Sequence, residues 1–131
     1  MAQVQTNLIN HAIRAGVAAR FERVDKAQVS KVLEVLWSSP VDRAIETTLL
    51  FVLRQRARRE IGDLTARLIV EGLMEVKKQA GGDLEKAKAF AAEFLGLFKW
   101  VYEATQYARI GRNQIPQLDL DGYLRMLGFR V

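Results

Sequence analysis

Cysteine is absent from this sequence, and histidine occurs only once, at position 11. A chain without cysteine has no disulfide framework and no thiolate metal ligands, and one histidine cannot form a histidine metal cluster. We therefore expect neither a metal site nor a bound cofactor, and a fold that is held together by packing alone.

Long apolar runs are also absent. The longest, residues 47–53, is about a third of the ~18 uncharged apolar residues that indicate a membrane span. The N-terminal segment has no Lys or Arg ahead of a hydrophobic run and no small-residue cleavage site, so it does not resemble a signal peptide. We expect a protein that is soluble when made, or that assembles onto something larger.

Proline occurs only at positions 40 and 116, and apolar residues recur at three- and four-residue spacing almost everywhere between them. This spacing is typical of amphipathic α-helices. A chain of 131 residues, half of them hydrophobic, can bury one core. We predict an all-α fold in which an N-terminal helical arm, residues 1–39, precedes a helix-bundle domain, residues 40–131. The fold should contain about five helices and a short C-terminal helix.

Breaks and capping residues set the bounds of these helices. The expected helices span residues 4–20, 26–37, 40–59, 64–79, 84–110 and 118–129. Side chains that suit a helix N-terminus stand before most of them, namely Asp25, Ser39, Asp63, Asp83, and Asp119 or Asp121. Gly81 and Gly82 form the clearest loop.

Apolar stripes predict which face of each helix is buried. The helix 64–79 should bury Leu64, Leu68, Ile69, Leu73 and Val76. The stripe of the longest helix runs from Leu84 to Ala108. The segment 49–53 is apolar on all sides, which predicts burial between several neighbours.

Some apolar side chains lie outside the predicted buried stripes. Trp100, Tyr102 and Tyr107 lie off the stripe of the longest helix, so they either pack against another subunit or form half-exposed core. Gly16 weakens the first helix, which is expected to need a partner surface. Both features favour self-assembly.

Positive charge is concentrated in the first half of the chain. Residues 1–60 hold ten Lys or Arg against six acids, whereas residues 61–131 hold ten against nine. No acid precedes Glu22. A local excess of this kind attracts a polyanion, although Arg-rich helices also mark a GC-rich or heat-adapted host.

Four arginines crowd into residues 54–59, the sequence RQRARR. Arg54 and Arg58 share one side of a helix, and Arg59 lies about a quarter-turn further round. Cations at a helix C-terminus stabilise its dipole and free carbonyls, so a structural role is one interpretation. Contact with phosphate is the other, because guanidinium groups pair with phosphate oxygens in a bidentate manner.

No constellation predicts catalysis. The acid pairs Glu71 with Glu75 and Asp119 with Asp121 are typical of solvated helix faces, and His11 has no nearby nucleophile. The Gly81–Gly82 loop lacks the preceding strand and following Lys of a phosphate-binding loop. We expect no enzyme activity and no small-molecule substrate.

Two stretches resemble the major capsid proteins of filamentous and rod-shaped archaeal viruses. Residues 19–41, ARFERVDKAQVSKVLEVLWSSPV, are similar to that family's arm, with a basic-aromatic pair, a helix cap, a Val-led amphipathic helix and a closing Pro. Residues 54–73, RQRARREIGDLTARLIVEGL, resemble its Arg-rich helix, Ile-Gly break and following apolar helix. The stretch after Asp25 departs from the family pattern, because it lacks an Asn-Pro.

This resemblance implies a virion protein, made in the host cytoplasm, whose arms wrap double-stranded DNA in A-form. Its subunits would pair as homodimers or heterodimers and then form a helical polymer, with or without an envelope. The residues that would face phosphates are Arg14, Arg20, Arg23, Lys26 and Lys31 of the arm, and Arg54, Arg58 and Arg59 of a second contact line. Backbone contacts of this kind require no base-reading element.

Two other interpretations stay open. One is the small helical subunit of a CRISPR effector complex, which would bind a nucleic-acid backbone with the bundle rather than with its first twenty residues. The other is a helical protein-interaction module without nucleic acid, in which residues 54–59 only stabilise a helix end. The region 29–42 is not a convincing helix-turn-helix, because its turn has Pro in place of the usual glycine.

Overall fold

The computed structural model describes residues 6–105 and 109–131. All regular structure in these residues is helical, which confirms the predicted all-α class. The elements are α1 (Thr6–Phe21), α2 (Lys26–Ser38), the short 3-10 helix η1 (Val41–Arg43), α3 (Ala44–Ala57), α4 (Asp63–Ala80), α5 (Leu84–Ala104), the 3-10 helix η2 (Arg112–Gln117) and α6 (Leu120–Met126). None of these helices combines the length and apolarity that crossing a bilayer requires.

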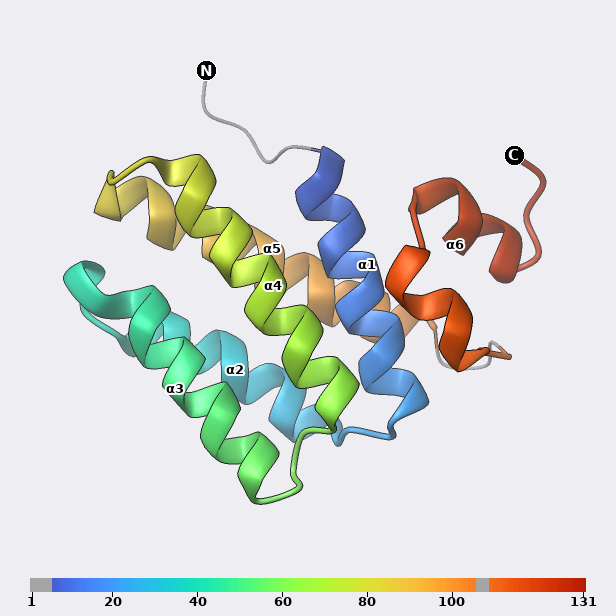
Figure 1. Cartoon of the computed structure of the whole chain (residues 1–131), viewed down its shortest axis with the longest axis horizontal. Helices are drawn as coiled ribbons and strands as arrows, with labels where there is room; N and C mark the ends of the chain where they lie inside the picture. Colours follow the sequence, from blue (N-terminus) through green and yellow to red (C-terminus); the bar gives the residue numbers. More distant parts are fainter. Residues whose placement is uncertain (1–5, 106–108) are drawn as a thin grey trace.

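Helix α1 is a central element of the bundle. It packs mainly against α4 and α5 and also contacts η2 and α6 (Figure 1). Its small side chains allow this close packing, because Ala12, Ala15 and Ala18 are completely buried. A Cβ added at Gly16 would lie 2.6 Å from the Cβ of Val101 on α5, so this glycine serves a close helix approach.

The part of the predicted arm that the structure describes, residues 6–39, packs into the bundle. Residues of α1 and α2 share one hydrophobic core with α3, α4 and α5. Burial of the alanine-rich face stabilises α1 despite its modest helix propensity, since most helical stability in proteins comes from tertiary packing. The predicted start of this helix at Val4 lies outside the described residues.

Helices α2 and α3 form an antiparallel hairpin at one side of the bundle (Figure 1). The chain turns after Ser39 and Pro40 into η1, so α3 begins at Ala44 rather than at Pro40. The segment 49–53 is not buried on all sides, because α3 packs against neighbours on only one side. Leu50 is 68% and Leu53 46% exposed, whereas Val52 is completely buried.

Helix α4 confirms the predicted burial pattern, with Leu64, Leu68, Ile69, Leu73 and Val76 all buried. Helix α5 buries Phe90, Phe94 and Phe98 as expected, but Leu84 is 49% exposed. The helix ends at Ala104 instead of residue 110, with Thr105 as its C-cap. The predicted stripe residue Ala108 lies outside the described residues.

The aromatic residues off the α5 stripe have two different environments. Tyr102 is buried, and its hydroxyl donates a 2.6 Å hydrogen bond to the carbonyl of Val24. Trp100 is 70% exposed. Tyr107 lies outside the described residues. Tyr102 is thus core, whereas Trp100 is a large apolar side chain at the surface of α5.

Candidate nucleic-acid interface

One end of the bundle gathers the end of α1, the start of α2, the end of α3 and the start of α4 (Figure 1). We call this region the basic end; its exposed cations are Arg23, Lys26, Arg54, Arg56, Arg58 and Arg59. Residues 54–67 alone carry five arginines against two carboxylates. The structure therefore brings together most of the predicted phosphate-contact residues.

Glu22 joins the two chain segments that form the basic end. Its carboxylate accepts hydrogen bonds from the backbone N–H of Leu64 at 3.1 Å and of Thr65 at 2.7 Å, and from the Thr65 hydroxyl at 2.6 Å. A Cβ at Gly62 would collide with this carboxylate. Glu22 thus caps α4, where Asp63 was predicted to act as the cap. The free amides at the start of α4 are used by this cap.

Two further carboxylates near the basic end, Asp63 and Glu103, have cationic partners, whereas Asp25 and Glu60 form no ion pair within the described residues. Arg56 Nε lies 2.8 Å from Asp63 Oδ1, and Lys26 Nζ lies 3.6 Å from Glu103 Oε2. Both pairs are solvent-exposed, so each contributes little to stability. Arg54, Arg58 and Arg59 form no ion pair within residues 6–105 and 109–131.

Arg23 and Arg59 share an unusual backbone conformation, with φ of 58° and 62°. Each follows the C-terminus of a helix, α1 or α3. The next residue returns a hydrogen bond to the last turn, from Val24 N to Ala19 O and from Glu60 N to Gln55 O, both at 2.9 Å. This is the position that glycine usually occupies at the end of a helix. Two exposed arginines stand there instead.

Arg14 and Arg20 are engaged within the fold. Arg14 Nε donates to the carbonyl of Leu118 at 2.7 Å. Arg20 lies 3.9 Å from the centre of the Tyr102 ring and donates to the Tyr102 carbonyl through Nε and Nη2, at 3.2 and 2.9 Å. Both side chains are half-buried and join α1 to the C-terminal half of the chain, and their role as phosphate contacts stays a prediction.

Lys31 lies further along α2 than the rest of the predicted site. The start of α2 is tied to the end of α3 by a 2.8 Å hydrogen bond from Gln55 Nε2 to Gln28 Oε1. Lys31 is exposed about one turn beyond this bond. It extends the positive surface along the outer side of α2 without belonging to the basic end.

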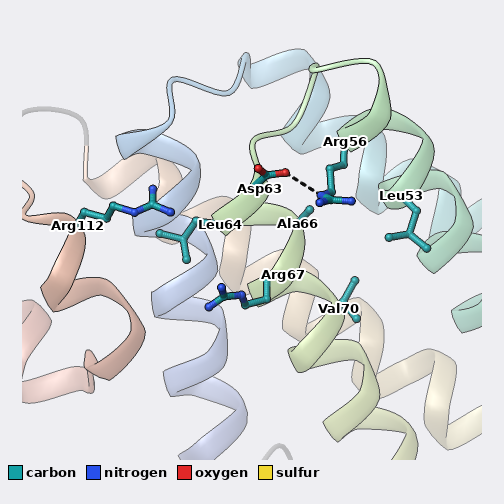
Figure 2. A pocket seen from close by; sticks show the side chains of 8 residues that line it. All are labelled: Leu53, Arg56, Asp63, Leu64, Ala66, Arg67, Val70 and Arg112. Carbon is teal, nitrogen blue, oxygen red and sulfur yellow. Dashed lines mark hydrogen bonds and ion pairs between the residues drawn. The ribbon is translucent and has the colours of Figure 1, made fainter.

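A groove of about 490 Å³ opens beside the basic end (Figure 2). Its lining comes from α3, α4 and η2 and consists of Leu53, Arg56, Asp63, Leu64, Ala66, Arg67, Val70 and Arg112. Figure 2 shows the Arg56–Asp63 pair on one side, with Arg67 and Arg112 extending toward each other on the other. Three guanidinium groups from three elements thus line one hollow.

Two arginines of this groove, Arg67 and Arg112, have no sequence pattern that marks them as candidates. Arg67 stands on the exposed face of α4, where its spacing from Leu64 and Leu68 indicates only a polar surface position. Arg112 begins η2, more than forty residues further along the chain. The approach of η2 to α1 brings it to the groove, and no local pattern predicts that contact.

Three titratable groups outside the basic end have structural roles or surroundings that shift their pKa. Burial lowers the pKa of His11, with a further contribution from Arg14. Glu75 accepts hydrogen bonds from Gln79 at 3.1 Å and Asn7 at 3.2 Å; the bond from Gln79 is the main cause of its lowered pKa. Asp119 accepts from Gly122 N at 2.8 Å and caps α6. Within the described ranges, no three acids or histidines are placed to share a metal ion.

A comparison with known protein families finds no match, and searches of curated proteins and of solved structures find none either. What the chain does must therefore be inferred from its own residues.

Proposed function

We propose that this chain is a structural, non-enzymatic protein that binds the phosphate backbone of a nucleic acid through its basic end. One observation carries the proposal: exposed arginines from two connections of the bundle meet at one end, where three of the five nearby carboxylates, Glu22, Asp63 and Glu103, already have partners. Cations without local partners are available to an external anion. Arginine suits phosphate in particular, because its planar fork matches two phosphate oxygens.

Two kinds of assembly fit this proposal. The first is a coat of double-stranded DNA in a virion, which the resemblance to archaeal viral capsid proteins suggests. Because α1 is part of the core, such a coat would use the basic end of the bundle and not a detached arm. Further capsid subunits would then complete the helical polymer.

The second is the small helical subunit of a CRISPR effector complex. This class would bind nucleic acid with its bundle surface. The observation that favours it is that α1 lies inside the bundle, with Arg14 and Arg20 bonded to backbone carbonyls. It requires no rearrangement of the fold before binding.

Salt-dependent binding tests the shared part of the proposal. Fluorescence anisotropy with a labelled duplex should show an affinity that falls steeply with salt, because cations of the protein release condensed counterions. Replacing Arg54, Arg58 and Arg59 with Gln should lower the slope of log affinity against log salt by about two to three. The matched control replaces Arg43, Lys78 and Lys86, which lie toward the opposite end of α3, α4 and α5, and should change the slope much less. An affinity that does not respond to salt would contradict the proposal.

Electron microscopy of the protein with long duplex DNA separates the two assemblies. Regular filaments of constant diameter would support a coat protein. Isolated particles bound along bare DNA would support a subunit of a larger complex.

A further inference from the structure

The groove beside the basic end combines guanidinium groups with apolar side chains. We propose that it binds one unpaired nucleotide of a single strand, an inference that rests on the proposed backbone-binding function. The phosphate would lie between Arg67 and Arg112, and the base would lie against Leu53 and Val70.

The shape of the groove supports a single strand. A duplex stacks the faces of its bases inside and presents phosphates along its outer ridges, so it has no flat apolar group to place in a hollow. An unpaired nucleotide offers a charged phosphate and an apolar base face together. The volume of about 490 Å³ lies within the ~300–1,000 Å³ of pockets that hold small-molecule-sized ligands.

The arginines of the groove differ in their availability. Arg56 forms an ion pair with Asp63, with 2.8 Å between Nε and Oδ1, but the pair is solvent-exposed and orients the planar guanidinium group only weakly. Such a plane is a surface on which a base can stack. Arg67 and Arg112 form no ion pair with any residue that the structure describes, so both are available to a phosphate.

The apolar part of the groove lies on the side of Arg56 and Arg67, across the groove from Arg112 (Figure 2). Leu53 is 46% exposed at the end of α3, and Val70 is partly buried on the facing turn of α4. A single exposed leucine is ordinary on a protein surface. Leu53, however, lines the same hollow as three arginines, and a base placed there would cover it from water while its phosphate meets Arg67 and Arg112.

The test compares a labelled oligothymidylate with a hairpin duplex of equal charge. Leu53→Ser should weaken oligothymidylate binding about fivefold, because the apolar surface that the base would cover is lost, and should change duplex binding by less than about twofold. The double variant R67Q/R112Q should weaken oligothymidylate binding about tenfold and lower its salt slope by about 1.4, the value for two phosphate contacts on a single strand.

Matched controls exist on the same helices. Leu50→Ser removes a leucine of α3 that is 68% exposed and lies outside the groove, and R43Q/K78Q removes two cations from the opposite ends of α3 and α4. Neither control should reproduce the loss. All of these side chains are exposed, and circular dichroism melting verifies that each variant is folded.

The failures are distinguishable. If neither nucleic acid binds in a salt-dependent way, the proposed function itself is wrong. If both bind and the groove variants lose single strand and duplex equally, or lose neither, only the nucleotide site is wrong. An oligoglutamate that competes as well as unlabelled oligothymidylate would also overturn it, because the groove would then accept any anion.

Discussion

The left-handed backbone at Arg59 has an energetic cost. A residue with a Cβ at positive φ is strained by about 1 kcal/mol or more relative to glycine, because the Cβ approaches the following carbonyl oxygen. The same conformation recurs at Arg23, at the same end of the molecule. Residues that keep such strain tend to cluster at functional sites. This is the reason to include both arginines in the proposed interface.

Arg59→Gly should therefore stabilise the protein and weaken nucleic-acid binding at the same time. We expect the free energy of unfolding in urea to rise by about 1 kcal/mol, since glycine accepts φ of 62° without strain. Duplex affinity should fall with the loss of one phosphate contact. Arg58→Gly is the control, because Arg58 has φ of −84° and gains no relief of strain. Equal stabilisation by both variants would contradict the explanation.

His11 gives the fold a dependence on pH. Its pKa is lowered from 6.5 by burial and then by Arg14, while Glu75 and Glu71 act weakly in the opposite direction. Below pH 6.5 the unfolded chain binds a proton that the folded chain binds only at lower pH, so acidification favours unfolding. The urea midpoint should thus decrease from about pH 7.5 to about pH 5.5. His11→Gln should remove most of this decrease, because the chain has no other histidine.

At the scale of elements, the packing of α1 bears on whether the N-terminal segment can leave the bundle. Its buried face contacts α4 and α5, and its end supplies the Glu22 cap of α4. An arm that swings out to wrap DNA would expose this face and remove that cap. Both effects would destabilise the fold, because apolar burial would be lost and amides at the start of α4 would be left without a hydrogen-bond acceptor.

Deleting residues 1–24 should therefore leave a chain without a cooperative thermal transition. The deletion removes Leu8, Ala12, Val17 and other core residues that are completely buried. Circular dichroism melting provides the measurement, and a deletion of residues 1–5 is the control because it leaves α1 intact. A truncated chain that melts cooperatively would restore the interpretation of residues 1–39 as an independent arm.

Apolar spacing and capping residues predicted the helices well where neighbouring residues alone determine the structure. The stripe of α4 and the caps at Asp83 and Asp119 follow from spacing and from residues three positions apart. The Glu22 cap joins residues 42 and 43 positions apart, and the Arg20 bond spans 82 positions. The short windows from which helices and caps are predicted do not contain both partners of such contacts. The position of α1 in the core and the groove at Arg112 could not be predicted for the same reason.

At the scale of the whole molecule, the proposed coat function also requires contacts between copies of the chain. The described residues leave several large apolar side chains at the surface, among them Trp100, which is 70% exposed. Trp100 lines a second groove of about 360 Å³ on α5 with Leu97, Gly96 and Glu93. This groove shares no lining residue with the groove at Arg56, Arg67 and Arg112, so a subunit contact there would not use these arginines.

Trp100→Ser should lower self-association while leaving the fold intact. Sedimentation velocity over a range of protein concentrations measures the association, and the melting temperature should stay nearly constant because the side chain is mostly solvent-exposed. Trp37→Ser is the control, since Trp37 is 60% exposed on α2 beside Lys88 and lies outside this groove. If the wild-type chain stays monomeric at all concentrations, with and without nucleic acid, then α5 is not a subunit contact. A filament coat would then need a different interface, and the subunit of a larger complex would become the better account of the basic end.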